Sequence, residues 1–150
     1  LLPHIIAGIL HYIKDMTVFL NPTEASYSRF GHSKAPLYIS WSAENRSQLL
    51  RVPGSVYEKE RAELRSPDPS ANPYLAFALL IRAGMFGIMN NMTPPPAADI
   101  NFFHNDKDLY KNFDKLPSTL DEAIAVMKES EFIKDCLPEQ IIDLYSRKLI

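Results

Sequence analysis

Residues 67–77 read Pro-Asp-Pro-Ser-Ala-Asn-Pro-Tyr-Leu-Ala-Phe, and this stretch marks the start of a helix. Asn72 has the short polar side chain that caps helix N-termini, and Pro73 suits the first helical position, where no amide hydrogen is needed. In the predicted helix, over residues 73–90, Arg82 is the only charged residue. A helix that is apolar on nearly all sides packs inside a core, so we expect it to be buried in a larger one.

Upstream of this helix, the spacing of apolar residues predicts a second one. Apolar residues recur at steps of three and four over residues 3–16, which places them on one helix face. His4 and His11 fall on the opposite face. They could share a metal ion or belong to a solvated polar stripe, and no third ligand is evident. Asn21-Pro22 ends the helix.

The residues between the two helices alternate in the manner of strands. Three strands are predicted, at residues 37–42, 49–52 and 61–65. We therefore expect an α+β fold in which antiparallel strands, from Leu37 to Ser66, are packed by the helices at 3–16 and 73–90. Gly84 and Gly87 would allow the backbone of a neighbouring helix to approach closely.

The last third of the chain is predicted to be helical. Thr119 and Glu122 form a capping box for one helix, and Pro138 opens another. A proline-rich break separates this helical extension, residues 93–150, from residues 1–92, and we assign both to the same domain.

Composition excludes several classes of protein. The chain has 150 residues and a net charge of −2, so it is one domain or part of a larger one and carries no basic field for nucleic acid. Cys136 is its single cysteine, which excludes an internal disulfide and a cysteine-based zinc site. No apolar run reaches the roughly 18 residues of a membrane span. We expect a cytoplasmic protein without a membrane partner, and a start at Leu1 inside a helical pattern indicates a fragment.

The arginines gather in the first half of the chain. Five of the seven lie between residues 29 and 65. Arginine suits bidentate binding of carboxylate or phosphate, so this gathering indicates an anion site or, equally, ordinary surface strands. In Arg61-x-Glu63-x-Arg65 the three side chains would share one strand face, roughly 7 Å apart. They could form a salt-bridge ladder, or a site where the carboxylate holds a divalent cation and the arginines hold anionic oxygens.

Several motifs follow one another in a specific order. They are Asn21-Pro22-Thr23, Ser26-Tyr27-Ser28-Arg29, Ala35-Pro36, Asn45-Arg46-Ser47, Leu50-Arg51-Val52-Pro53, Arg61-Ala62-Glu63-Leu64-Arg65 and the Pro-Asp-Pro-Ser-Ala-Asn-Pro-Tyr segment. This order resembles the C-terminal half of the catalytic domain of glutamine synthetase. The resemblance runs from about His4 to Asn91, and more loosely to Ile150. It implies that the strands form part of that family's catalytic barrel.

The resemblance also implies roles for individual residues. Arg29 and Arg65 match arginines that bind the glutamate substrate. Arg46 matches a catalytic arginine near the transferred phosphoryl group, and it also contacts ATP. Arg51 and Arg61 match arginines on the ATP phosphate side. Glu63 matches a ligand of the metal, Mg²⁺ or Mn²⁺, that bridges the nucleotide phosphates.

The implied reaction is the ATP-dependent ligation of glutamate and ammonia through an acyl phosphate. Phosphoryl transfer mainly requires positioning and neutralisation of charge, which arginines and a metal-binding carboxylate supply. The family forms rings with sites between neighbouring subunits, so the resemblance implies a homo-oligomer. The family's other metal ligands lie upstream of Leu1, so we expect this chain to be inactive by itself.

Two further positions bear on the resemblance: Lys34 departs from the family pattern, and Tyr110 matches a modified residue of some members. Lys34 stands at the position of the flap glutamate that accepts a proton from ammonium, and it reverses the charge. The alternatives are therefore a glutamate ligase that uses another amine, or a non-catalytic assembly protein of this family. Tyr110 resembles a tyrosine that some bacterial members adenylylate; the alternative, which we favour, is an ordinary helix tyrosine, packed or exposed.

Overall fold

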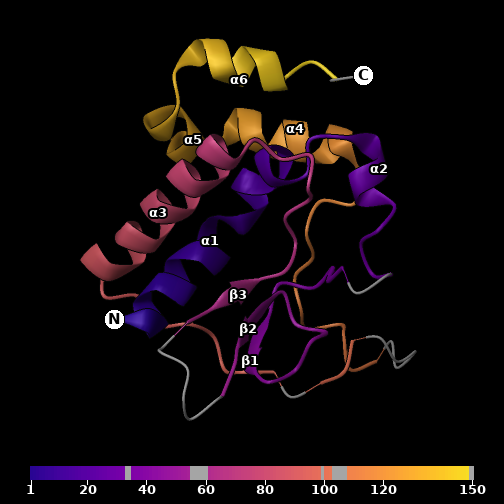
Figure 1. The fold of residues 1–150 in the computed structure, drawn as a ribbon, viewed down its shortest axis with the longest axis vertical. Coiled ribbons are helices and arrows are strands. Elements are labelled where there is room, and N and C mark those ends of the chain that lie inside the picture. Colours follow the sequence, from indigo (N-terminus) through magenta and orange to yellow (C-terminus); the bar gives the residue numbers. More distant parts are fainter. Residues whose placement is uncertain (33–34, 55–60, 99, 103–107, 149–150) are drawn as a thin grey trace.

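The computed structural model describes residues 1–32, 35–54, 61–98, 100–102 and 108–148. Its helices are α1 (Leu2–Leu20), α2 (Glu24–Tyr27), α3 (Pro73–Met89), α4 (Leu120–Glu129), α5 (Glu131–Cys136) and α6 (Glu139–Tyr145), and its strands are β1 (Trp41–Ala43), β2 (Leu50–Val52) and β3 (Glu63–Leu64). The helices form the upper and left-hand parts of the molecule in Figure 1, and the small sheet lies below them. The α+β class expected from the sequence is confirmed.

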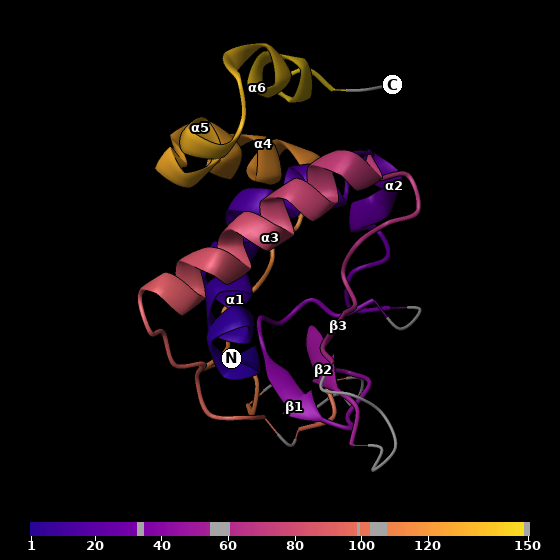
Figure 2. The ribbon, with the colours of Figure 1, turned by 60° about the vertical axis from the view of Figure 1, so that its left-hand side comes forward.

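The two long helices pack against each other along most of their length, as Figure 2 shows from a second direction. Their backbones meet at Gly8 of α1 and Gly87 of α3: a Cβ placed on Gly87 would lie 2.8 Å from the Gly8 nitrogen. Gly84 faces the side chain of Ile5. The close approach predicted from the glycines of α3 is therefore present in the fold.

One hydrophobic core joins the first and last thirds of the chain. The cluster contains Ile13, Met16 and Phe19 of α1 together with Met127 of α4 and Ile133 of α5. All five are fully buried. The helical extension therefore packs directly on α1. No helix among the described residues has both the length and the apolar character of a membrane span.

The sheet differs from the expected antiparallel arrangement. β2 and β3 pair antiparallel, whereas β1 and β2 pair parallel. Parallel neighbours usually need a long crossover. Here each strand has three residues and covers only about 10 Å, so the loop of residues 44–49 can return the chain to the start of β2.

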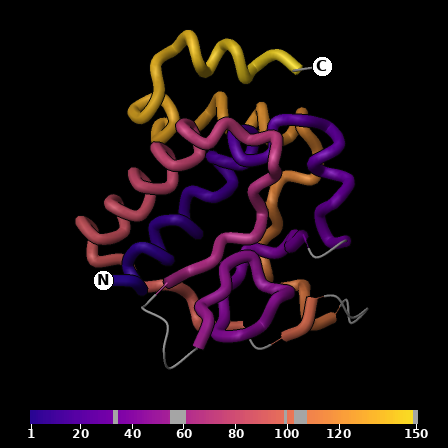
Figure 3. The backbone as a smooth tube through the Cα atoms, viewed as in Figure 1, coloured from indigo at the N-terminus to yellow at the C-terminus, as the bar shows by residue number. Residues whose placement is uncertain are grey.

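The first predicted strand is also shorter than expected, because part of it pairs elsewhere. Ile39 N donates to Asp114 O at 2.8 Å, and Leu116 N donates to Leu37 O at 2.9 Å. Figure 3 shows the segment after α3 passing beneath the strands before it rises to α4. The backbone of residues 37–39 is thus satisfied by this distant segment, and β1 begins only at Trp41.

The prediction of a buried helix over residues 73–90 is wrong for this structure. Ala76, Leu79, Ala83, Gly84 and Gly87 are buried, but the opposite side of α3 faces solvent. The helix is apolar on both sides, while the described chain covers only the side that faces α1.

Helix ends follow the sequence closely. Asn72 Oδ1 accepts hydrogen bonds from Tyr74 N at 3.0 Å and from Leu75 N. Thr119 Oγ1 accepts from Glu122 N at 3.1 Å, as the capping box predicts. The short α2 and α5 were not predicted; α5 begins at Ser130, whose hydroxyl accepts from Ile133 N.

We expect Asn72→Ala to lower the free energy of unfolding by about 1 kcal/mol, because two amide groups of the first turn of α3 lose their acceptor. Chemical denaturation followed by circular dichroism measures the change. Asn112→Ala, at an exposed turn residue, is the matched control and should have almost no effect. Equal stability of the Asn72 variant and the parent would contradict the capping role.

Candidate functional site

A cluster of charged side chains lies on β2 and β3, and the register of the strands explains it. The antiparallel pairing sets Arg51 directly opposite Glu63, so that their side chains can meet on one face. Arg51 Nη1 donates a hydrogen bond to Glu63 Oε2 at 3.2 Å, and Arg65 Nε donates to Glu63 Oε1 at 3.1 Å. The Glu63 carboxylate therefore lies between two guanidinium groups.

The members of this Arg51–Glu63–Arg65 cluster differ in exposure. The side chains of Arg51 and Arg65 are 14% and 13% exposed, and that of Glu63 is 43% exposed. The backbone N of Arg65 donates to Leu49 O at 2.9 Å, which holds the residue just beyond β3 against the start of β2. In such an arrangement the guanidinium groups can bind an anion, and the accessible carboxylate can bind a cation.

Glu44, the residue before the Asn-Arg-Ser motif, adds a second carboxylate to which no role was assigned from the sequence. It follows β1 with φ at 68°, a left-handed conformation that is uncommon for a residue with a Cβ. Arg51 Nε donates to the backbone O of Glu44 at 3.1 Å, and Gly54 N donates to Glu44 Oε1 at 2.5 Å. Because its partners Arg51 and Gly54 lie on and after β2, the sequence pattern could not predict these contacts of Glu44.

The Asn-Arg-Ser motif forms a turn that is tied to a distant segment. Asn45 Oδ1 accepts from the backbone N and the hydroxyl of Ser47, both at 2.9 Å. Asn45 Nδ2 and Gln48 Nε2 then donate to Ile100 O at 3.0 and 2.6 Å. Arg46, between the two bonded residues, is exposed. The motif therefore fixes the backbone on both sides of an accessible arginine.

Arg29 lies in a different contact. Its Nη2 is 3.2 Å from Asp68 Oδ2, and Asp68 N donates to Leu20 O at 2.9 Å at the end of α1. Burial alone would raise the pKa of Asp68, but hydrogen bonds from Ser70 and Ser26 and the charge of Arg29 outweigh it and hold that pKa below its ordinary value.

Two of these arginines have buried nitrogens without an acceptor among the described residues. They are Arg29 Nε, Arg29 Nη2 and Arg65 Nη1; Nη2 is near Asp68 as an ion pair but makes no hydrogen bond to it. A buried donor without a partner is costly, and a guanidinium group offers five donors in a planar fork. These donors are therefore unsatisfied within the described part of the chain.

The predicted site residues thus do not all lie together. Arg51, Glu63 and Arg65 are in contact, whereas Arg29 pairs with Asp68 instead. Arg46 and Arg61 are exposed. Lys34, the predicted flap position, lies outside the described residues.

The described chain offers a metal ion one suitable ligand at this site. Both oxygens of Glu63 accept from a guanidinium, but each keeps a further lone pair that could coordinate a cation. Among the described residues there is no group of three or more His, Cys, Asp or Glu side chains that could hold a metal. Glu63 therefore fits Mg²⁺ or Mn²⁺ as one carboxylate ligand, and the other ligands of the ion would have to come from outside the described residues.

Tyr110 is a packed residue in this structure. Its ring is buried beside Phe102 and Tyr38, and its hydroxyl donates to Asn101 O at 2.9 Å. Attachment of a nucleotide to this oxygen would require the hydrogen bond to break.

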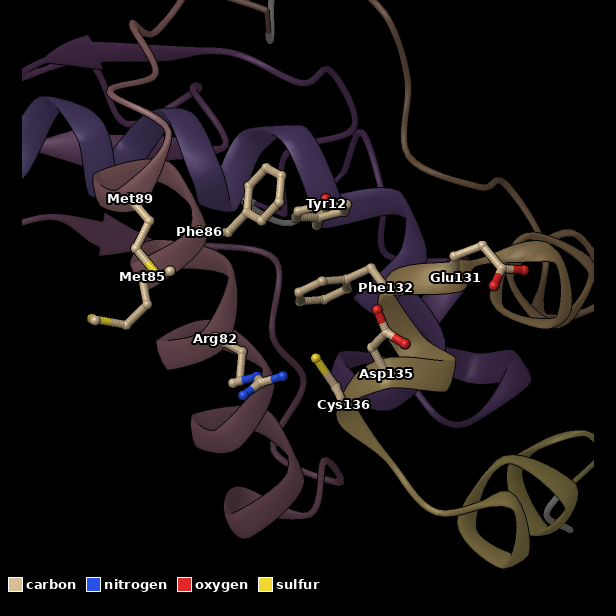
Figure 4. A pocket seen from close by; sticks show the side chains of 9 residues that line it. All are labelled: Tyr12, Arg82, Met85, Phe86, Met89, Glu131, Phe132, Asp135 and Cys136. Carbon is tan, nitrogen blue, oxygen red and sulfur yellow. The ribbon is translucent and has the colours of Figure 1, made fainter.

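A pocket of about 340 Å³ lies away from the arginine cluster, between α1, α3 and α5. Figure 4 shows Tyr12, Phe86 and Phe132 gathered at one side and Met85 and Met89 at the other. Tyr12 and Phe132 stack with ring centres 4.0 Å apart. We call it the α5 pocket, and no predicted site residue lines it.

The lowered pKa of Asp68 predicts how stability depends on pH. A carboxyl group whose pKa is lower in the folded than in the unfolded state stabilises the fold above the unfolded value, about 3.9, and this stabilisation is lost as the pH falls through the folded value. We expect Asp68→Asn to lower the unfolding free energy by roughly 1 kcal/mol at pH 7 and by much less near pH 2. Denaturant titrations at both pH values measure this, with Asp143→Asn on the exposed side of α6 as the control. A loss that is the same at both pH values would contradict the prediction.

Comparison with known proteins adds the family context. The family model described as "Glutamine synthetase, catalytic domain" matches residues 1–148. The chain is 46% identical over 144 residues to a glutamine synthetase of Methanosarcina mazei and 40% identical over 148 residues to that of Thermotoga maritima. These matches cover 93% and 96% of this chain and 32% and 34% of the relatives, so the chain spans about a third of their length.

Solved structures agree with this comparison. A GmaS/ADP complex matches with a TM-score of 0.80 at 26% identity, over 96% of this chain and 34% of that one. Apo GmaS matches with a TM-score of 0.81 at 28% identity, over 96% and 32% of the two chains.

Proposed function

Because this chain belongs to the glutamine synthetase catalytic-domain family, we propose that it supplies part of the active site of an ATP-dependent ligase. The full-length protein joins glutamate to ammonia. ATP phosphorylates the γ-carboxylate of glutamate, and ammonia then displaces phosphate from the acyl phosphate. The reaction makes glutamine, a step of nitrogen metabolism.

The observation that carries this proposal is the Arg51–Glu63–Arg65 cluster, in which a carboxylate lies between two guanidinium groups. In this proposal Arg65 and Arg29 bind glutamate, as the resemblance to the family implies. Preorganised donors of this kind stabilise negative charge without reorganisation during the reaction.

The other arginines handle the phosphates. Arg51 and Arg61 bind the phosphate chain of ATP. Arg46 is held in an exposed position by the Asn45–Ser47 turn, from which it reaches the transferred phosphoryl group. Phosphoryl transfer requires these positioned charges and no nucleophile from the protein.

Glu63 is the residue of this chain that would hold Mg²⁺ or Mn²⁺, which when bound neutralises phosphate charge. The remaining ligands come from the part of the full-length protein that this chain does not contain. Because those ligands are absent, we propose that residues 1–150 are inactive alone. We also propose that the full-length protein works as a homo-oligomeric ring, as the resemblance to the family implies.

A second candidate keeps the ligase chemistry but changes the amine. Lys34 replaces the flap carboxylate that accepts a proton from ammonium in the family, so a different amine, deprotonated by another group, is the alternative nucleophile. The similarity to GmaS, one structure of which contains ADP, agrees with nucleotide binding and leaves the amine open. Loss of catalysis, with retention of an assembly role, is the third alternative.

Isothermal titration of the full-length protein tests the proposal. We expect a phosphinic glutamate analogue to bind tightly in the presence of a non-hydrolysable ATP analogue and Mg²⁺, and much more weakly without the metal. No metal-dependent binding of either ligand would overturn the ligase function and favour the assembly protein. Assay of the same protein with ammonia and with small alkylamines then identifies the amine.

A further inference from the structure

Glu44 makes three contacts with β2 and the residues after it, although it lies outside the sheet. It directly follows β1, which runs beside β2 (Figure 2). Its backbone N donates to Val52 O at 3.3 Å, and its backbone O accepts from Arg51 Nε at 3.1 Å. Its carboxylate accepts from Gly54 N at 2.5 Å. One residue therefore ties the end of β1 both to β2 and to the chain that follows β2.

The backbone of Glu44 adopts a conformation that needs such support. Its φ of 68° lies in the left-handed region, which is strained for a residue with a Cβ. Strain of this kind persists only where surrounding contacts hold it, and it is concentrated at functional sites. The hydrogen bond from Gly54 N to the Glu44 carboxylate supplies that support. It depends on the glycine, because a Cβ at residue 54 would lie 2.7 Å from Glu44 Oε1.

The result of this strained turn is the orientation of Arg51. The guanidinium of Arg51 donates from Nε to the Glu44 carbonyl and from Nη1 to Glu63 Oε2 at 3.2 Å. Because a guanidinium is planar, bonds from two of its nitrogens fix the direction of its plane. Loss of the Glu44 carbonyl would leave the group free to turn about its bond to Glu63.

The charge of Glu44 contributes less than the turn does. Glu44 Oε2 lies 3.8 Å from Arg51 Nη2, and the Glu44 side chain is 65% exposed. An exposed ion pair at this distance is weak, because water and salt screen it. The carboxylate therefore acts on Arg51 mainly through the backbone conformation that it holds.

We propose that Glu44 is a positioning residue for Arg51: its bond to Gly54 holds the left-handed turn whose carbonyl orients the guanidinium for the phosphates of a nucleotide. A donor that is already oriented binds phosphate without the cost of ordering its side chain. The role in phosphate binding rests on the proposed function, whereas the orientation of Arg51 by Glu44 does not depend on it.

Arginine modification tests the orientation in the absence of any ligand. The full-length protein and its Glu44→Ala and Glu44→Gln variants are treated with phenylglyoxal, and modification of Arg51 is quantified by mass spectrometry. Glutamine keeps an oxygen that accepts from Gly54 N and loses the charge, whereas alanine loses both. We expect Arg51 to react at least about threefold faster in the alanine variant and at nearly the parent rate in the glutamine variant. Arg147, an exposed residue beyond α6, is the internal reference.

Two results of the modification would overturn the proposal. One is an Arg51 rate that is the same in the parent and in Glu44→Ala, since the turn would then not hold the guanidinium. The other is an equally raised rate in both variants, since the charge and not the turn would then protect Arg51.

Nucleotide binding measures the consequence of the orientation. Isothermal titration of the same proteins uses ADP with Mg²⁺ and, separately, the phosphinic glutamate analogue. We expect Glu44→Ala to weaken the binding of ADP about tenfold and to leave that of the glutamate analogue within about twofold. Glu44→Gln should bind ADP within about threefold of the parent. Glu129→Ala, at an exposed position on α4, is the control and should match the parent for both ligands.

The pattern across the two ligands separates positioning from a general loss of structure. Equal weakening of both ligands in Glu44→Ala would contradict a specific effect on Arg51, and so would unchanged binding of ADP. A parent protein that binds no ADP would overturn the proposed function instead, and the modification rates alone would then decide whether Glu44 orients Arg51.

Discussion

Gly87→Ala is expected to lower the free energy of unfolding by about 3 kcal/mol. A Cβ at this position would overlap the carbonyl oxygen of His4 and would lie 2.8 Å from the Gly8 nitrogen. Both neighbours are backbone atoms of α1, so they cannot move without separating the two long helices. The core that α1 shares with α3 and α4 would loosen with them.

Gly84→Ala is the matched control, on the same helix and one turn earlier. A Cβ there would lie 3.1 Å from the Cγ2 methyl of Ile5, a side-chain atom that can yield by a few tenths of an ångström. Alanine also favours the helix by about 0.5–1 kcal/mol relative to glycine. We therefore expect a change within about 1 kcal/mol. Denaturant unfolding of both variants gives the comparison, and equal losses would show that the backbone contact at Gly87 is not limiting.

Glu63→Gln in the full-length protein is expected to reduce kcat/KM by about 100-fold or more. The substitution keeps the shape of the side chain and removes its charge. It takes away the proposed metal ligand, and it also weakens the bonds from Arg51 and Arg65. The concentration of Mg²⁺ or Mn²⁺ that gives half-maximal activity should rise by about tenfold.

The metal dependence separates this role from a purely structural one. If Glu63 only orients the two arginines, activity would fall while the half-activating metal concentration stayed unchanged, and that outcome would contradict the assignment. Glu129→Gln, at an exposed position on α4, should leave both quantities unaltered. Thermal unfolding of the two variants checks that each is folded.

Features that depend on neighbouring residues could be predicted from the sequence. Asn72 and Thr119 cap their helices as expected, because the donors they satisfy lie two or three residues away. The α1 helix follows from the spacing of its apolar residues, and the approach of Gly87 to α1 follows from its missing side chain.

Features that depend on residues far apart in the chain could not be predicted from the sequence. The Glu44 contact with Arg51 and the pairing of Arg29 with Asp68 join segments whose relation is fixed only by the fold. Residues 37–39 pair with the segment at 114–116 and not in the predicted sheet, because a backbone amide bonds whichever carbonyl packing brings near it.

The amino-acid sequence by itself determined the positions of α1, α3, α4 and α6, the α+β class and the family, since capping, periodicity and motif order all depend on short stretches of chain. Only the tertiary structure decided that β1 and β2 run parallel, that Glu63 lies between two guanidiniums, and that the outward side of α3 is left open. Those outcomes follow from packing between residues far apart in the chain. The apolar surface that an element can bury depends on which other segments pack against it.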